Sequence, residues 1–540
     1  MRNVMPQSYR FMVTTPHYLA SQVGSSILQH GGNAVDAAVA IGAALAVVYP
    51  HMTGLGGDSF FMIYSAKQNK VAGLNGSGRA AAAAHPDLFR QQGFTRLPDR
   101  GVQSALTVPG TVDAWWEAWS AYGGGKLAWA DLLAPALRYA EEGVPISRNV
   151  HAWMVRDEAL LRADPVLHAL YFDSAAASSS SVLKREGAKL AQPMLAESLR
   201  AIMEGGRDAF YTGGLMQAMV GAIREDGGYL TEQDFAAHRS EWVEPLAVTY
   251  RGLRICQMPP NSQGFALLMM LNMLDRIELA RIPRHSAAFY HLMAEVVKRA
   301  FRLRDLHLTD PAFHAIPLDR LLSGDLAEEL VRDILSPTAA QSDGYASPPS
   351  GQDTSYAAVV DEEGNAVSFI QSLYYDFGSA YVAGETGIIL QNRGSYFSLD
   401  DGHPNVLAPG KRTFHTLMPG MALKEGKPCL LMGTQGGEGQ PQTQLSILTG
   451  IVDYGCTIQE AISLPRWVYG RTWGEDSDKL RLENRQLGDA AERLKRSGHQ
   501  VEVVEEWDGI MGQAQGIRIS DDGLLSGAAD PRGDGSAIGG

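Results

Sequence analysis

At 540 residues the chain is too long for one ordinary domain, so its length predicts two to four domains or one large intertwined α/β unit. A formal net charge of −14 excludes the basic surface that binding to nucleic acid or an anionic membrane requires. The three cysteines, Cys256, Cys429 and Cys456, are far apart, which excludes a disulfide framework and a cysteine-built zinc site and is typical of a reducing compartment.

The beginning of the chain carries no export signal that we can recognise. Residues 1–12 show neither an apolar core nor a small-residue cleavage site. The longest apolar stretch, residues 37–49, is rich in alanine and too short to span a bilayer. We therefore expect a cytoplasmic protein with no membrane partner.

Residues 17–64 predict two helices, a glycine turn and a strand. The second helix, at residues 34–48, is apolar nearly all round, so it should be buried and should end before Pro50. G-L-G-G-D at residues 54–58 predicts a tight turn, and F-F-M-I-Y after it predicts a short buried strand.

Residues 100–335 alternate amphipathic helices with loops, and residues 336–353, rich in Ser, Pro, Gly and Ala, are typical of a flexible linker. After the linker, the pattern predicts a β-hairpin whose turn is D-E-E-G-N. Further strands are expected at residues 386–391, 420–424 and 428–432, and a helix at 446–453. The part of the chain after the linker has strands followed by helices, and the part before the linker is rich in helices. This order predicts a layered α/β/β/α sandwich.

Thr354 is the first residue after the linker, at the start of a strand. A threonine hydroxyl is a poor nucleophile without a nearby base. Cleavage between Asp353 and Thr354 would free an α-amine, with a pKa of about 8, that could take the hydroxyl proton directly or through a water. The alternative is that Thr354 is only a β-branched residue that opens a strand.

Seven strings spread over nearly all of the chain resemble, in order, the γ-glutamyltransferase family of N-terminal-nucleophile (Ntn) hydrolases. They are A-S-Q-V-G-S-S-I-L-Q-H-G-G-N-A-V-D-A-A-V-A, M-T-G-L-G-G-D-S-F-F, M-P-P-N-S-Q-G, A-E-V-V-K-R-A-F-R-L-R-D, G-E-T-G-I-I-L-Q-N-R-G, G-T-Q-G-G-E-G-Q-P-Q and G-A-A-D-P-R-G-D-G. The resemblance implies an αββα Ntn sandwich and a precursor that cuts itself. Thr354 falls on the position of the new N-terminal threonine, which attacks an amide carbonyl.

The resemblance also divides the chain. It implies a large subunit, residues 1–353, and a small subunit, residues 354–540, that stay associated because each supplies part of one sandwich. Two such heterodimers could form a heterotetramer. We expect no cofactor and no metal, because the sequence lacks HExxH and shows neither a Rossmann nor a P-loop fingerprint in a strand-to-helix context.

Three further catalytic roles follow from the resemblance. Ser372 matches a hydroxyl residue that orients the nucleophile, although a polar strand residue would look the same. Gly436 and Gly437 match a glycine pair whose backbone N–H groups stabilise the tetrahedral oxyanion, and glycine lets backbone donors approach a substrate closely. The alternative for this pair is a simple turn.

The substrate-binding positions depart from the family pattern. Where γ-glutamyl enzymes grip the α-carboxylate with an arginine, this chain has Ser77, and Arg79 is displaced. The other replacements are Tyr374 for an asparagine, Arg393 for a glutamine, Tyr396 for an aspartate, His415 and Thr416 for a serine pair, and Tyr356 for a histidine.

These replacements point to a different substrate head group. Loss of the aspartate removes the counter-charge for an α-ammonium, and Arg393 adds a fixed cation that suits a carboxylate. Tyr374 and Tyr396 would narrow the pocket and offer hydroxyl donors. Arg393 could instead belong to a structural salt bridge.

Four strings are most similar to a cytoplasmic branch of the family that includes oxamate amidohydrolase, of purine breakdown, and cephalosporin-acylase-like proteins: F-I-Q-S-L-Y-Y-D-F-G-S, Q-N-R-G-S-Y-F-S-L-D, K-R-T-F-H-T-L and P-R-W-V-Y-G-R-T-W-G. Our leading hypothesis is a self-processing amidohydrolase for a small carboxylate-bearing amide, with oxamate as the specific candidate. The alternatives are a γ-glutamyltransferase or glutathione hydrolase, a glutaryl or cephalosporin acylase, and an inactive scaffold protein.

Overall fold

Two seven-stranded antiparallel sheets form the centre of the fold. The computed structural model describes residues 5–174, 181–335, 353–470 and 477–540, so the expected linker lies outside the described residues except for Asp353. The first sheet, here the β12 sheet, has the order β21 (Ser536–Gly539), β2 (Met12–Thr15), β12 (Asp353–Val360), β13 (Ala366–Tyr374), β3 (Asp58–Ser65), β4 (Lys70–Asn75), β9 (Glu241–Val243). The second, the β15 sheet, has the order β1 (Gln7–Ser8), β20 (Leu525–Ala529), β19 (Ala514–Ile519), β15 (Lys427–Thr434), β14 (Gly420–Lys424), β11 (Leu253–Gln257), β10 (Leu246–Tyr250).

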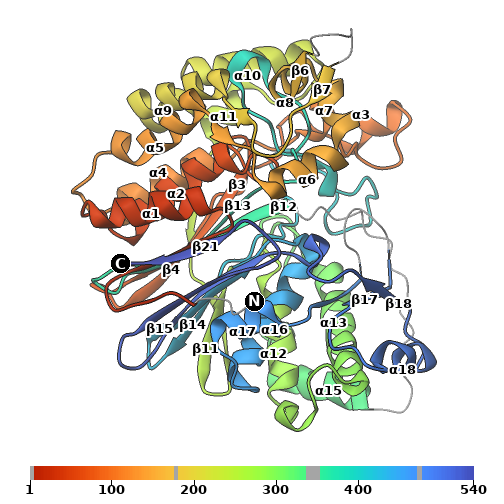
Figure 1. The fold of residues 1–540 in the computed structure, drawn as a ribbon. Coiled ribbons are helices and arrows are strands. Elements are labelled where there is room, and N and C mark those ends of the chain that lie inside the picture. The colour runs from red at the N-terminus through yellow and green to blue at the C-terminus, as the bar shows by residue number, and fades with distance from the viewer. Residues whose placement is uncertain (1–4, 175–180, 336–352, 471–476) are drawn as a thin grey trace.

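The two sheets pack face to face, and helices cover each outer face (Figure 1). Over the β12 sheet lie α1 (Tyr18–Gln29), α2 (Ala34–Val48), α4 (Thr111–Tyr122), α5 (Trp129–Glu142) and α9 (Pro193–Tyr211). Over the β15 sheet lie α12 (Gly264–Leu274), α13 (Ala287–His307), α15 (Gly324–Leu335), α16 (Gln440–Val452) and α17 (Ile458–Ser463). The expected α/β/β/α sandwich is confirmed, and segments on both sides of Thr354 build each sheet.

Smaller elements complete the described chain. The remaining helices are α3 (Pro86–Gln91), α6 (Arg148–Arg156), α7 (Glu158–Ala163), α8 (Pro165–Tyr171), α10 (Gly214–Glu225), α11 (Glu232–Ala237), α14 (Leu318–Leu321) and α18 (Ala490–Arg496). The remaining strands are β5 (Val144–Pro145), β6 (Phe172–Ser174), β7 (Ser181–Leu183), β8 (Lys189–Leu190), β16 (Trp467–Tyr469), β17 (Leu480–Glu483) and β18 (Val501–Val504).

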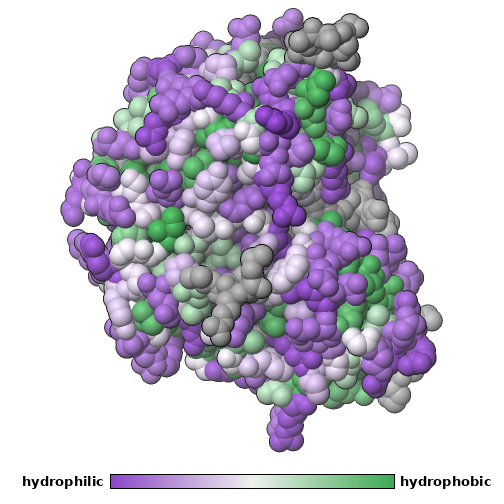
Figure 2. Space-filling model, viewed as in Figure 1, coloured by the Kyte–Doolittle hydropathy of each residue, from purple (hydrophilic) through white to green (hydrophobic). Residues whose placement is uncertain are grey.

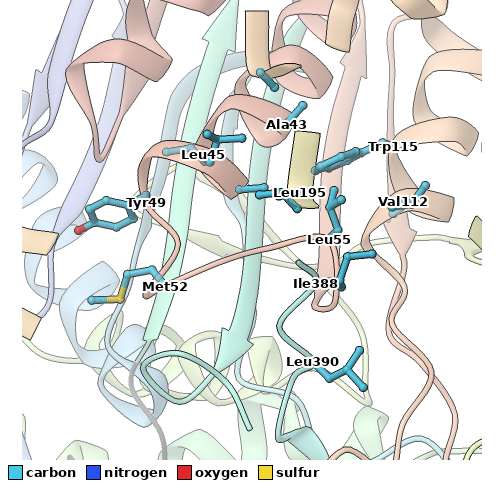
Figure 3. Packing of buried hydrophobic residues seen from close by; sticks show 14 of the residues in the cluster. Ala43, Leu45, Tyr49, Met52, Leu55, Val112, Trp115, Leu195, Ile388 and Leu390 are labelled. Carbon is cyan, nitrogen blue, oxygen red and sulfur yellow. The ribbon is translucent and has the colours of Figure 1, made fainter. Parts of the chain in front are cut away.

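Helix α2 is buried along its whole length, as its composition predicts. The side chain of Asn33 caps its N-terminus and Asp36 completes a capping box, which satisfies backbone donors that no helical partner can reach. Ala43 and Leu45 extend from α2 into the core where Trp115 of α4 also packs (Figure 3). The chain after α2 turns back as β3, whose first residue is Asp58.

The predicted hairpin is confirmed as β12 and β13, joined by residues 361–365. Here the two sheets approach closely, because Gly433 of β15 leaves room for the ring of Tyr356. A Cβ at Gly433 would lie 2.1 Å from that ring. β12, the strand that contains Thr354, is therefore held between the β15 sheet and α2.

Two expectations about strands are wrong. Residues 386–391 do not form a strand but a loop that makes only isolated bridges, at Ile389 and Leu390, since Gly387 takes a left-handed φ of 68° that interrupts an extended run. In addition, the helical middle of the chain contains β9, β10 and β11. β9 and β10 are edge strands of the two sheets, and β11 pairs between β10 and β14. These strands are only partly buried, so the alternation of apolar and polar residues that indicates a strand is weak in their sequence.

Hydrophilic side chains cover most of the face seen in Figure 2, with hydrophobic residues in small separate groups. Within the described ranges, no helix combines the length and the apolar character needed to cross a bilayer.

Candidate active site

Thr354 is the second residue of β12 and is 1% exposed. Asp353 pairs with Tyr374, and Ser355 pairs with Gln371, so the ladder is shifted between these two pairs. Thr354 lies inside this bulge, across from residues 372 and 373 of β13. A bulge lifts a residue out of the regular ladder and re-aims its side chain, which suits a residue that must meet a substrate.

Ser372 and Tyr374 lie at the end of β13, separated by Leu373. The Ser372 hydroxyl accepts a hydrogen bond from the backbone N–H of Tyr374 at 2.8 Å. Tyr374 has a φ of +85°, which a side chain of its size rarely adopts and which costs on the order of 1–3 kcal/mol. Both expected site residues therefore lie directly opposite the Asp353–Thr354 segment, and the strained backbone at Tyr374 faces Asp353.

Arg393 lies in a short 3₁₀ turn and is 1% exposed. Its guanidinium donates to Thr416 Oγ1 at 3.2 Å and to Ser372 Oγ at 3.4 Å, and it stacks on the Tyr374 ring with its centre 4.3 Å from the ring centroid. Within the described ranges, no carboxylate lies within ion-pair distance of Arg393, and its Nε has no hydrogen-bond partner. The structural salt bridge considered for Arg393 is not present among these residues.

Burying a guanidinium without a direct counter-ion is costly. Burial lowers the pKa of Arg393, and the negative charge of Asp58 opposes that shift. Cation–π contact with Tyr374 recovers part of the cost. An anionic ligand would recover more of it, so this guanidinium is suited to binding an anion.

Asp58, at the start of β3, pairs with Ser372 across the sheet and was not predicted as a site residue. One carboxylate oxygen accepts from the backbone N–H groups of Gly78 and Gly110 and from Gln391 Nε2, at 3.0–3.1 Å. The other lies 3.1 Å from Nε2 of His415. Burial by itself raises the pKa of Asp58, but its bond to His415 and the charge of Arg393 more than offset this and hold the pKa below its usual range.

His415 is fully buried, and burial lowers its pKa to about 4. Its Nδ1 accepts from the backbone N–H of Leu417 at 3.3 Å, so Nε2 carries the proton that is donated to Asp58. His415 is therefore a neutral donor that fixes the Asp58 carboxylate, and its neighbour Thr416 holds Arg393.

Acid should destabilise the protein through His415. An unfolded histidine takes a proton near pH 6.5 and the buried one only near pH 4, so between these values the unfolded chain binds more protons. Stability should therefore fall as the pH decreases through this window, by about 1.4 kcal/mol per pH unit for one such histidine. The melting temperature should drop between pH 7 and pH 5, and less in His415→Gln. An equal drop in both proteins would contradict this.

Gly436 and Gly437 form the turn between β15 and α16. Their φ values are 124° and 49°, a region that side chains other than glycine rarely adopt. Both residues are buried, and neither backbone N–H donates a hydrogen bond to any other described residue. Two buried, unused donors on one turn are what an oxyanion site requires.

Tyr396 is brought to the same turn by Glu438. The Tyr396 hydroxyl donates to Glu438 Oε1 at 2.7 Å, and its ring stacks on Phe414 with centroids 4.4 Å apart. Tyr396 also lies against Tyr374, at a centroid distance of 5.1 Å. The two tyrosine rings therefore lie together, and the Tyr374 ring also contacts Arg393.

Ser77 is not placed beside Arg393. Its hydroxyl donates to Asn75 Oδ1 at 2.7 Å and accepts from Asn261 Nδ2 at 3.2 Å. Asn261 in turn accepts, through its carbonyl, from the backbone N–H of His415. Ser77 thus supports the site through Asn261. Arg79 is farther out, paired with Glu241 and Asp310.

Sequence reasoning missed four polar residues of this region, Asp58, Gln263, Arg304 and Glu438. All are buried, and each contacts a predicted site residue or its neighbour. Asp58 and Glu438 stand in glycine-rich turns, and Gln263 precedes a glycine. A charged or amide side chain in such a turn, next to an apolar strand or helix, is the signal that could have found these three. Arg304 lies inside α13 and carries no such signal.

A separate cluster joins His291 and Glu295 of α13 to His499, with ligand atoms within 4.8 Å of one another. The two imidazoles are hydrogen-bonded at 2.7 Å, and the Glu295 oxygens already pair with Lys298 and Arg299. The charge of Glu295 is therefore balanced without an ion. We interpret this cluster as a contact that ties α13 to the segment before β18.

A cleft of about 1200 Å³ lies between α6 and residues 506–510. Trp153, Arg156 and Trp507 are among the residues that line it, and it contains none of the predicted site residues. Gly512, just beyond this segment, lies beside the glycine turn, 3.6 Å from where a Cβ of Gly436 would be. The cleft is therefore a neighbour of the candidate site and not the site itself.

Taken together, the arrangement has the parts of an acyl-transfer site: a hydroxyl in a bulge, backbone donors that bond no other described residue, and a buried cation bonded to Ser372 across from the bulge. The αββα sandwich with helices on both faces is the architecture of the Ntn hydrolases. A family model described as gamma-glutamyltranspeptidase matches residues 20–540. The chain belongs to this family, whose members hydrolyse or transfer amides.

The similar proteins cover the whole chain. The glutathione hydrolase-like YwrD proenzyme of Bacillus subtilis is 50% identical over 533 residues, which is 98% of each chain. The oxamate amidohydrolase proenzyme of Klebsiella pneumoniae is 40% identical over 532 residues, again 98% of each. Among solved structures, the cephalosporin acylase from Bacillus halodurans is 36% identical and superposes with a TM-score of 0.89, covering 100% of this chain and 97% of that one. Names that denote proenzymes support one precursor that yields a large and a small subunit.

Proposed function

We propose that this chain cuts itself between Asp353 and Thr354 and then hydrolyses a small amide that carries a carboxylate, with oxamate as the specific candidate. The α-amine of Thr354 takes the hydroxyl proton, and the oxygen attacks the amide carbon while Gly436 and Gly437 donate to the oxyanion. The amine returns the proton to the leaving nitrogen, which departs as ammonia. A water then cleaves the ester and releases oxalate.

The observation that supports this substrate class is the position of Arg393. Its guanidinium is 3.4 Å from the Ser372 hydroxyl, and residue 372 lies across from Thr354 in the bulge. An anchor so close to the nucleophile suits an acyl group whose carboxylate is attached directly to the reacting carbonyl. Oxamate has this form, whereas several carbons separate the two groups in a γ-glutamyl amide.

A second candidate is glutathione hydrolysis, which the 50% identity to a glutathione hydrolase-like proenzyme favours. A γ-glutamyl substrate also presents an α-ammonium that needs an acceptor. Asp58 is the carboxylate whose charge acts on the pKa of Arg393. Both of its oxygens already accept hydrogen bonds. The described residues thus favour a substrate without an ammonium group.

A parallel assay separates the two candidates. The processed protein is incubated with oxamate and with glutathione, and ammonia and glutamate are measured. We expect ammonia and oxalate in equal amounts from oxamate and no glutamate from glutathione at millimolar concentration. Glutamate release without ammonia from oxamate would overturn the proposal in favour of the second candidate, and release of neither would direct the search to glutaryl amides.

A further inference from the structure

The buried side chain of Gln263 connects the two halves of the candidate site. Gln263 directly precedes α12 and is 0% exposed. Its Nε2 donates to the carbonyl of Gly437 and to the carbonyl of Thr416, both at 3.0 Å. Gly437 belongs to the turn of Gly436 and Gly437, here called the oxyanion turn, and the Thr416 hydroxyl accepts from Arg393. One amide group therefore contacts both the oxyanion turn and the residue that holds Arg393.

The orientation of this amide is fixed by chemistry. Its Oε1 accepts from Arg304 at 2.9 Å, and an arginine can only donate. The oxygen must therefore face Arg304, and the two N–H donors must face the two carbonyls. Each N–H of the amide is used, so Gln263 has no freedom to rotate without breaking buried hydrogen bonds.

Arg304 extends this connection to the other end of the turn. It pairs with Glu438, which follows Gly437 and also accepts from Tyr396. Gln263 thus holds the Gly437 carbonyl while Arg304 holds the next side chain. A turn built from two glycines with positive φ has little stiffness of its own, so these outside contacts decide where its N–H groups point.

The two sides of this contact come from different parts of the chain. Gln263 and Arg304 precede Thr354, and Gly437, Thr416 and Glu438 follow it. In the proposed processed enzyme the large subunit would therefore position groups of the small subunit without touching the substrate.

We propose that Gln263 is a positioning residue that sets the oxyanion turn at a fixed place relative to Arg393. This inference rests on the proposed function, because it takes Gly436 and Gly437 as the oxyanion donors. A substrate held by Arg393 then presents its carbonyl oxygen to the donors in one geometry. Loss of the Gln263 amide should reduce the rate of the chemical step more than the binding of substrate.

The test compares Gln263→Met with Gln192→Met. Gln192 is 5% exposed and donates to the carbonyl of Val47 in α2 at 2.8 Å, so its variant also loses a buried amide, but one that bonds to α2 and not to the turn. We expect Gln263→Met to lower kcat on oxamate by about 10- to 100-fold with KM within about threefold, and Gln192→Met to leave kcat within about twofold. If the melting temperature falls by a similar amount in both variants, a difference in stability cannot account for the difference in kcat between them.

Inactivation by phenylmethanesulfonyl fluoride makes the test independent of the substrate. Its sulfonyl oxygen occupies the oxyanion position, and it does not need Arg393. We expect Thr354 of the wild type to be labelled and Gln263→Met to be labelled about tenfold more slowly than Gln192→Met. Equal labelling rates in the two variants would overturn the proposed role of Gln263 and leave the proposed nucleophile unaffected. A wild type that is cut but never labelled at Thr354 would overturn the proposed nucleophile and this inference with it.

Discussion

Thr354→Ala should leave the protein as one chain of 540 residues and abolish hydrolysis of every amide substrate. The hydroxyl is the proposed nucleophile both for the cut and for turnover, so no other group can replace it. Removing the nucleophile of a hydrolase costs on the order of 10⁶-fold in kcat, and we expect a loss of at least about 10⁴-fold here. Gel electrophoresis and intact mass measurement follow the cut, and ammonia release follows turnover.

Two variants make this expectation specific. Thr354→Ser keeps a hydroxyl and an α-amine, so it should still be cut, with slower turnover. Thr449→Ala removes another fully buried threonine, whose hydroxyl donates to the Leu445 carbonyl at 2.8 Å, and it should be cut and turn over normally. The new N-terminus should begin at residue 354. A Thr354→Ala protein that is cut at the same bond would refute the assignment of the nucleophile.

Elements that depend on local pattern could be predicted from the sequence. The apolar stretch that forms α2, the turn before β3 and the hairpin of β12 and β13 all carry their signal in consecutive residues. The strand expected at residues 386–391 failed because a β-favouring composition does not reveal a left-handed glycine at 387. All of the linker except Asp353 falls outside the described residues. The cut between Asp353 and Thr354 stays a prediction.

The candidate site could be predicted only in part. Resemblance to the family located Thr354, Ser372 and the glycine pair, and the structure places Ser372 across from Thr354. The contact between Asp58 and His415 spans 357 positions, and no local pattern indicates it. Sequence reasoning described Arg393 as a cation gained in a site that had lost its anion, the aspartate at the position of Tyr396. The structure adds that a carboxylate lies close enough to affect its pKa but makes no direct pair with it.

Because Arg393 is buried without a direct counter-ion, its replacement should have the second large effect on activity. Arg393→Met should lower kcat/KM for oxamate by about 100- to 1000-fold, because the substrate carboxylate loses a buried, charged partner. Oxamide has nearly the same shape and no charge, so its hydrolysis should change by less than about fivefold. The wild type should prefer oxamate over oxamide, and the variant should lose that preference. Ammonia release from both compounds measures this ratio within one protein preparation.

The ratio is informative because damage to the fold would affect both compounds equally. If Arg393 only supports Ser372 and Tyr374, hydrolysis of oxamate and oxamide should fall together. Arg393→Lys keeps the charge but cannot donate in a fixed fork, so it should recover part of the preference and not all of it. Arg79→Met, which removes a half-buried arginine paired with Glu241 and Asp310, should leave the ratio unchanged. A cation at position 393 that selects the carboxylate would then agree with the replacement of the family's aspartate by Tyr396, which removes the expected partner of an ammonium group.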